Sequence, residues 1–299
     1  MDGPAYSIII PHRDTPELLR RLLQSVPWSL GLQVIVVDDD STEAHYGEVQ
    51  RLAGEYGFEL YQVCGHSAGA ARNAALTHAQ GYWLVFADAD DYFMPDAATL
   101  LAAHADDGAE VVYFGVESRY SDNGTPSYRD QQVTRLMDMC DKRHSLDALK
   151  ALHTNPWGKM IRRELVEREG ICFEEIPSAN DAFFSVRCGV KAREVTMDRR
   201  KLYCITVSGQ SLTSNMSRER FESNGQARLR VNRYLRRHGL GRYQLSVLHY
   251  FLLSWRYGLR AGAKATRDCL RDGNNPLVGL SALISPERIR HSLMSRPKK

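Results

Sequence analysis

The sequence contains no apolar run long enough to span a membrane, and the residues near Met1 do not resemble a signal peptide. Its six cysteines are scattered and include no Cys-x-x-Cys pair, which argues against a zinc ribbon. Separate cysteines of this kind fit reduced thiols rather than a disulfide framework. We therefore expect a cytoplasmic location.

Two common nucleotide-binding motifs are also missing. No Gly-x-Gly-x-x-Gly follows the first predicted strand, so a dinucleotide-binding fold of the usual kind is not supported. The P-loop pattern Gly-x-x-x-x-Gly-Lys-Ser/Thr is absent as well. The composition, 43% hydrophobic and 25% charged, is typical of a globular protein with a sizeable core.

Predicted strands and helices alternate regularly over residues 1–115. Short apolar segments predict strands, and apolar residues at helical spacing predict helices between them. The predicted strands are residues 5–10, 33–37, 58–63, 82–86 and 110–116. This alternation predicts an α/β fold with a mainly parallel, Rossmann-like wound sheet. Asn123-Gly124 is a hairpin signal and predicts a β-excursion within residues 116–132.

Carboxylates follow two of the predicted strands. Asp38 and Asp39 end the second strand, and Asp88, Asp90 and Asp91 follow the fourth. Open α/β sheets bind their ligands at the carboxyl ends of their strands. These positions therefore favour a nucleotide whose base and ribose meet Asp side chains and whose phosphates meet a metal, although a solvated acidic turn is the simpler reading of each cluster.

Residues 67–76 predict a helix rich in small residues that begins after the third strand. Free N–H groups and the helix dipole at such a terminus favour phosphate. Arg72 adds a fork of donors that suits a diphosphate; the alternative is a surface helix residue.

Several of these segments match one family in order and spacing. They are Ser7–Pro11, Val36–Thr42, Ala70–Ala74, Phe86–Asp91, Asn155–Leu165 and Ile176–Phe184. Together, over roughly residues 5–215, they resemble the family 2 glycosyltransferases with the GT-A fold, common in bacterial polysaccharide and lipopolysaccharide synthesis. The chain departs from the family pattern at Asp40, where Gly is usual, and at Asn180, where Glu is usual.

The resemblance implies an inverting hexosyltransferase that takes a hexose or N-acetylhexosamine from a UDP-sugar. It implies a Mn²⁺ or Mg²⁺ cofactor, with Asp90 as the main ligand and Asp88 as a second ligand or ribose contact. It places the general base on Asp181. The acceptor is expected to be an oligosaccharide or a lipid-linked saccharide.

The remaining expected contacts divide into two sets. Nucleotide-binding residues are expected to be Pro11, His12, Asp14, Asp38, Asp39, Arg72 and Asp88. Residues that bind sugar or acceptor are expected to be Trp157, Lys159, Asn180 and Asp91. Purely structural roles remain open, with Asp181 or Asp91 as a helix cap, Trp157 as a core residue and His12 as an ordinary loop residue.

Two other functions remain open at this stage. One is a non-catalytic module that binds nucleotide sugars. The other is a nucleotidyltransferase of similar sheet topology. The latter would need a basic, glycine-containing phosphate loop after the first strand, and His12-Arg13-Asp14 is a poor one.

Charge separates the chain into an acidic body and a basic end. Residues 215–299 contain 18 Lys and Arg but only 5 Asp and Glu, within a net charge of +3 for the chain. We expect a GT-A catalytic domain at 1–215, with a nucleotide-sugar half at 1–115 and an acceptor half at 116–215, and a basic helical region at 216–299. That region is expected to pack on the body or to contact an anionic membrane from the cytoplasmic side. Nucleic acid is not an expected partner, because no recognised motif accompanies the charge.

Overall fold

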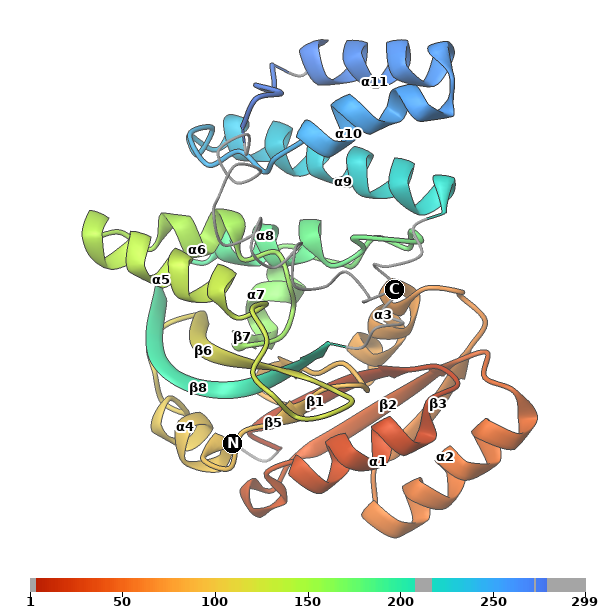
Figure 1. The fold of residues 1–299 in the computed structure, drawn as a ribbon. Helices are drawn as coiled ribbons and strands as arrows, with labels where there is room; N and C mark the ends of the chain where they lie inside the picture. Colours follow the sequence, from red (N-terminus) through yellow and green to blue (C-terminus); the bar gives the residue numbers. More distant parts are fainter. Residues whose placement is uncertain (1–3, 208–216, 272, 279–299) are drawn as a thin grey trace. The chain divides into compact units, whose positions relative to one another are not determined.

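The computed structural model describes residues 4–207, 217–271 and 273–278 (Figure 1). By contacts the chain divides into two compact units, Met1–Met216 and Ser217–Lys299. Each unit is described by itself.

One mixed sheet organises the first unit. Its strands in the described residues are β1 (Tyr6–His12), β2 (Gln33–Asp39), β3 (Glu59–Val63), β4 (Trp83–Phe86), β5 (Tyr92–Phe93), β6 (Val111–Tyr120), β7 (Lys159–Arg162) and β8 (Val195–Val207). Their spatial order is β3-β2-β1-β4-β7-β6-β8-β5. The pairs within β3-β2-β1-β4 and the pair β6-β8 are parallel, whereas β7 and β5 pair antiparallel with their neighbours. The predicted mainly parallel α/β sheet is confirmed.

Helices connect the strands and cover the sheet (Figure 1). They are α1 (Pro16–Ser25), α2 (Glu43–Tyr56), α3 (Ala68–His78), α4 (Ala97–Ala103), α5 (Gln131–Arg143), α6 (Asp147–Leu152), α7 (Arg163–Arg168) and α8 (Ala182–Lys191), with a short 3₁₀ turn at Trp28–Leu30. Crossovers between parallel strands are right-handed, so α1 and α2 cover one face and α3 covers the other. Burial on both faces explains why β1, β2 and β4 are continuous apolar runs.

The register of the parallel strands brings distant polar residues to one edge of the sheet. His12 at the end of β1 lies beside Asp38 in β2. On the other side of β1, Ile9 pairs with Phe86, the last residue of β4, so the acidic segment that follows Phe86 emerges at the same edge. The fold thus gathers the predicted ligand-binding residues from three separate loops.

The expected turn at Asn123-Gly124 is present, but the β-structure that follows it is short. Strand β6 continues to Tyr120, and Gly124 turns the chain in a left-handed conformation with φ 68°. Beyond this turn the described residues make only a single bridge, Arg119 with Pro126, rather than a second hairpin strand. The long strand β8 was not predicted, because its residues 198–201 are all charged and interrupt the apolar pattern.

The second unit contains α9 (Arg218–Arg237), α10 (Leu248–Leu253), a 3₁₀ turn η2 (Ser254–Tyr257) and α11 (Leu259–Arg271). Its small core consists of Phe221, Leu229, Val247, Tyr250, Ala265 and Cys269. The predicted Arg-rich helix of residues 216–240 corresponds to α9. Among the described helices, none combines the length and apolar character that a membrane crossing requires.

A partly buried polar cluster joins the end of α4 to β8. The ring nitrogens of His104 lie 2.9 Å from Asp107 Oδ2 and 3.0 Å from Asp198 Oδ2. Burial alone would raise the pKa of Asp198, but hydrogen bonds from Arg200 and His104 outweigh it and hold the pKa at about 2. The ionised carboxylate therefore stabilises the fold.

The stabilising effect of Asp198 should depend on pH. Because its pKa is lower in the folded chain, its contribution is complete above about pH 4 and is lost as the pH falls towards 2. Asp198→Asn should lower the free energy of unfolding by about 2 kcal/mol at pH 7 and by about half as much at pH 3. Urea unfolding at both pH values measures this. Asp122→Asn, at an exposed position, is the control, and an equal loss at both pH values for Asp198→Asn would contradict the assignment.

Candidate active site

Three carboxylates lie together in the segment between β4 and β5. One oxygen from each of Asp88, Asp90 and Asp91 lies within 4.8 Å of the others. Asp91 is buried and accepts a hydrogen bond from the backbone N–H of Thr206 at 2.7 Å. The backbone carbonyl of Asp90 accepts hydrogen bonds from Thr206 Oγ1 and from the Arg21 guanidinium. Strand β8 and helix α1 thus hold the acidic segment in place.

The acidic cluster has the chemistry of a site for a hard cation. Burial raises the pKa of Asp91 well above its usual range, and the charges of Asp90 and Asp88 raise it further. Carboxylate oxygens are the ligands that Mg²⁺ and Mn²⁺ prefer. A divalent cation would relieve the mutual repulsion of these groups, so the residues present fit such an ion.

Arg72 connects the acidic segment to a second segment far away in the sequence. Its side chain, 4% exposed, projects from α3 and donates to Asp88 Oδ1 at 2.5 Å and to Asn180 Oδ1 at 3.2 Å. Its guanidinium carbon also lies 5.3 Å from the centre of the Phe173 ring. Arg72 is therefore no surface residue, and it places Asn180 and the following Asp181 beside the carboxylates.

Asp181 immediately precedes α8, at the N-cap position, but its side chain makes no capping hydrogen bond. Burial raises the pKa of this half-buried carboxyl group; Arg72 opposes the rise, Asp88 adds to it, and Lys159 opposes it. The carboxyl group therefore lies within electrostatic range of both the arginine and the acidic cluster. Its position fits a proton acceptor rather than a helix cap.

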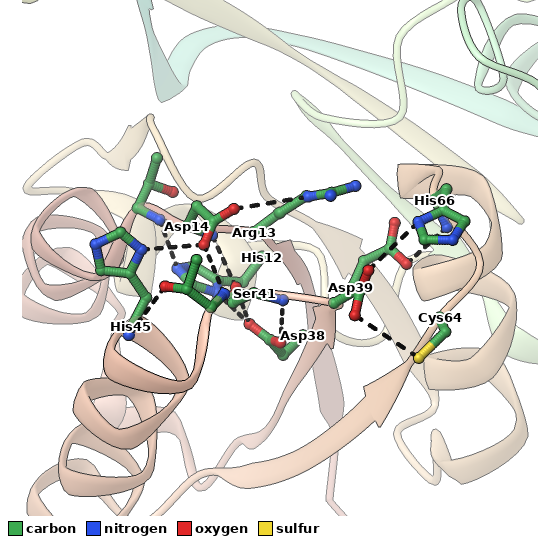
Figure 2. A network of polar contacts seen from close by, with 12 residues as sticks. His12, Arg13, Asp14, Asp38, Asp39, Ser41, His45, Cys64 and His66 are labelled. Carbon is green, nitrogen blue, oxygen red and sulfur yellow. Dashed lines mark hydrogen bonds and ion pairs between the residues drawn. The ribbon is translucent and has the colours of Figure 1, made fainter.

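The loops after β1 and β2 form a connected polar network (Figure 2). His12 Nδ1 donates to Asp38 Oδ2 at 2.8 Å, since His12 Nε2 accepts from the N–H of Thr15, and both side chains are fully buried. Asp38 also accepts from the N–H and the hydroxyl of Ser41. The carboxylate of Asp38 is thus engaged in holding the two loops together.

Asp14 and Asp39 extend this network on either side, as Figure 2 shows. Asp14 Oδ1 accepts from the N–H of Thr42 and lies 3.0 Å from His45 Nδ1, and these contacts lower the pKa of Asp14. Asp39 Oδ1 accepts from the N–H groups of Gly65 and His66, in the segment that leads into α3. Pro11 forms part of β1 beside Val37. All five expected residues of the first two loops therefore lie at the edge where the acidic segment begins.

Trp157 and Lys159 lie inside the unit instead of on the surface of a cleft. Trp157 stacks near Tyr203, with ring centres 6.3 Å apart. Lys159 is completely buried and donates to the carbonyl of His153 at 3.0 Å. Burial lowers its pKa to about 7, partly opposed by Cys188 and Asp181. Both side chains are therefore packed in the interior, as the core reading of Trp157 expects, and their contact with sugar or acceptor stays a prediction.

Several residues that shape the site had no recognisable signal in the sequence. The hydroxyl of Tyr203 accepts from the backbone N–H of Asp88 at 2.8 Å, and Thr206 holds both Asp90 and Asp91. Both belong to β8, the strand that the apolar pattern did not predict. Val207 ends the described part of this segment, and residues 208–216 lie outside the described residues.

A family model described as glycosyl transferase family 2 matches residues 7–170 of this chain. The chain is 26% identical over 235 residues to the putative glycosyltransferase EpsH of Bacillus subtilis, covering 75% of this chain and 67% of that protein. It is 25% identical over 222 residues to TarS of Staphylococcus aureus, a poly(ribitol-phosphate) beta-N-acetylglucosaminyltransferase. That match covers 70% of this chain but only 37% of TarS.

Solved structures show the same fold. The structure of S. aureus TarS 1-349 in complex with UDP-GlcNAc has a TM-score of 0.66 at 19% identity, covering 89% of this chain and 81% of that one. The mannosyltransferase PcManGT from Pyrobaculum calidifontis, in complex with GDP-Man and Mn²⁺, has a TM-score of 0.58 at 19% identity. It covers 94% of this chain and 79% of that one. The expected GT-A fold is confirmed.

Close packing at the start of α3 should be essential to this arrangement. A Cβ added to Gly69 would lie 2.2 Å from the carbonyl oxygen of Glu174 and 3.1 Å from Asn180 Cβ. Gly69→Ala must therefore displace the segment that carries Asp181, and should lower the free energy of unfolding by about 1–3 kcal/mol.

A second glycine provides the matched control. Gly54 lies within α2, and nothing lies within 4 Å of an added Cβ there. Gly54→Ala should stabilise the chain by about 0.5–1 kcal/mol, because alanine loses less backbone entropy in a helix. Urea unfolding of both variants measures the two effects. Equal effects of the two substitutions would show that the contact at Gly69 is unimportant.

Proposed function

The chain belongs to glycosyl transferase family 2, and from that premise we propose that it is an inverting, metal-dependent enzyme that uses a UDP-sugar. It transfers a hexose or N-acetylhexosamine to a hydroxyl group of a saccharide acceptor, in the assembly of a surface polysaccharide or lipo-oligosaccharide. The observation that carries the proposal is the joining of the acidic cluster, Arg72 and Asp181 through the contacts of Arg72 with Asp88 and Asn180. The same contacts link the segment of the proposed cation ligands to the segment of the proposed proton acceptor.

The donor nucleotide is assigned to the edge formed by β1, β2 and the acidic segment. Support comes from TarS, whose structure has been solved with UDP-GlcNAc and with UDP. In this chain the His12–Asp38 pair holds the first two loops in position. We assign the carboxylate of Asp39, next to the segment that leads into α3, to the uracil base. It can accept a hydrogen bond from the N3–H of uracil.

The diphosphate is assigned to the acidic cluster and Arg72. Asp90 and Asp88 are the proposed ligands of a Mn²⁺ or Mg²⁺ ion, supported by Asp91. The Mn²⁺ in the PcManGT complex supports this class of cofactor. When bound, the cation supplies Lewis-acid neutralisation of the departing diphosphate. Arg72 adds a permanent positive charge beside it, because its guanidinium stays protonated.

Asp181 is the proposed general base. The acceptor oxygen attacks the anomeric carbon from the face opposite the diphosphate while its proton passes to the Asp181 carboxylate. The bond from the anomeric carbon to the diphosphate breaks, its electron pair leaves with UDP, and the configuration at that carbon inverts. Burial raises the pKa of Asp181, which makes its carboxylate a stronger base than a solvated aspartate.

Replacement of Asp181 tests the catalytic assignment. Asp181→Asn keeps the shape of the side chain but removes the base, so transfer should fall by about 10²–10⁴-fold. Binding of UDP, measured by titration calorimetry in the presence of Mn²⁺, should stay nearly unchanged. Glu48→Gln, an exposed substitution on α2, is the control. A variant that retains near-full release of UDP from UDP-GlcNAc in the presence of acceptor would remove Asp181 from the mechanism.

Replacement of Asp90 tests the metal assignment separately. Asp90→Asn removes one anionic ligand from the cluster and should weaken Mn²⁺-dependent binding of UDP by at least about tenfold. Calorimetric titration with and without Mn²⁺ measures the effect. Asp96→Asn is the matched control, because Asp96 is an exposed aspartate nearby that makes no capping hydrogen bond. Identical Mn²⁺ titrations for the two variants would refute the role of Asp90.

A further inference from the structure

Helix α11 exposes an apolar stripe to solvent. Leu259 is 79% exposed and Leu270 is 61% exposed, although both are large aliphatic side chains. Ala263 and Thr266 lie between them at helical spacing, so the four residues follow one line along the helix. The side of α11 that carries Gly262, Ala265 and Cys269 is the one buried in the second unit.

A basic stripe runs beside the apolar one. Arg260, Lys264, Arg267 and Arg271 each follow a member of the apolar stripe by one residue, and all four are exposed. The single acidic residue of α11, Asp268, is largely buried: it accepts a hydrogen bond from Gln226 and lies 4.0 Å from Lys264 Nζ and 3.9 Å from Arg267 Nε. The exposed side of the helix therefore carries positive charge next to apolar surface.

The apolar surface continues from α11 onto η2. The ring of Trp255 covers Gly262 so closely that an added Cβ would lie 2.2 Å from a ring carbon. Trp255 remains 46% exposed. Trp255 and α11 form a shallow hollow of about 550 Å³. It is lined by Trp255, Ala263, Thr266, Arg267, Leu270 and Arg271. We call Trp255, the apolar stripe and the basic stripe together the α11 face.

We propose that the α11 face binds the surface of a bilayer that contains anionic lipids. Leu259, Leu270 and Trp255 enter the boundary between headgroups and acyl chains. Trp side chains favour this boundary because the ring is apolar and its N–H is polar. The basic stripe contacts lipid phosphates at the level of the headgroups. The helix lies in the plane of the membrane, as its two parallel stripes require.

The charge of the α11 face favours an anionic bilayer over two other occupants, a second copy of the chain and residues 279–299. A second copy would bring the same basic stripe against itself, and like charges in contact are unfavourable. Residues 279–299 contain five Lys and Arg and one Glu, so they too match the face in sign rather than complementing it. An anionic membrane complements both the positive charge and the apolar side chains.

Vesicle binding of the full chain tests this proposal. We expect sedimentation with phosphatidylcholine vesicles that contain about 30% phosphatidylglycerol, and little with phosphatidylcholine alone. Binding should weaken when salt is raised to about 0.5 M, which screens the charges. This readout needs no sugar transfer, so its result does not depend on the proposed function.

Two double variants separate the contributions of the stripes. Leu259→Ser with Leu270→Ser, and Arg260→Gln with Arg267→Gln, should each lower the vesicle partition coefficient by about tenfold or more. Leu277→Ser is the matched apolar control, because Leu277 is 60% exposed but lies after α11. Arg237→Gln on α9 is the matched charge control. Circular dichroism verifies that every variant is folded.

Three results would overturn the proposal. The first is a full chain that stays in solution with both kinds of vesicle, or sediments equally with both. The second is unchanged binding in both double variants. The third is a dimer, detected by light scattering without vesicles, that the leucine double variant dissociates; this would assign the face to a second copy.

Discussion

The buried guanidinium of Arg72 is the interaction on which the candidate active site depends. It joins Asp88, in the segment after β4, to Asn180, 92 residues later in the chain. A buried guanidinium needs acceptors, so neither segment can move away from Arg72 without leaving its N–H groups unpaired. The proposed cation ligands and the proposed base therefore belong to one rigid arrangement.

The rest of the first unit can be understood as support for this arrangement. Parallel strands end at one edge of the sheet, which brings the loops after β1, β2 and β4 together. Strand β8 supplies the Tyr203 hydroxyl, which accepts from the backbone N–H of Asp88, and Thr206, which donates to the Asp90 carbonyl and the Asp91 carboxylate. These contacts hold the acidic cluster in place despite its mutual repulsion, and the proposed divalent cation would complement its charge.

The side chains in the family motifs differ in burial and in hydrogen-bond partners, and the sequence does not reveal these differences. The side chains of His12 and Asp38 are hydrogen-bonded to each other, and those of Trp157 and Lys159 are buried in the interior. Asp181 has the same local context as an ordinary helix cap, yet makes no capping bond. A residue type and its spacing do not reveal burial or hydrogen-bond partners, because these are set by segments that are distant in the chain.

The sequence by itself determined the α/β class, the strands that carry the acidic residues, the family and the basic character of residues 215–299. These follow from local apolar periodicity and from motifs whose residues are contiguous. Only the tertiary structure decided the partners of Arg72, the inward position of Lys159 and the route of β8, since each needs contacts across the sheet. The tertiary structure also decided which side of α11 is buried. It therefore located the basic and apolar side chains that α11 exposes.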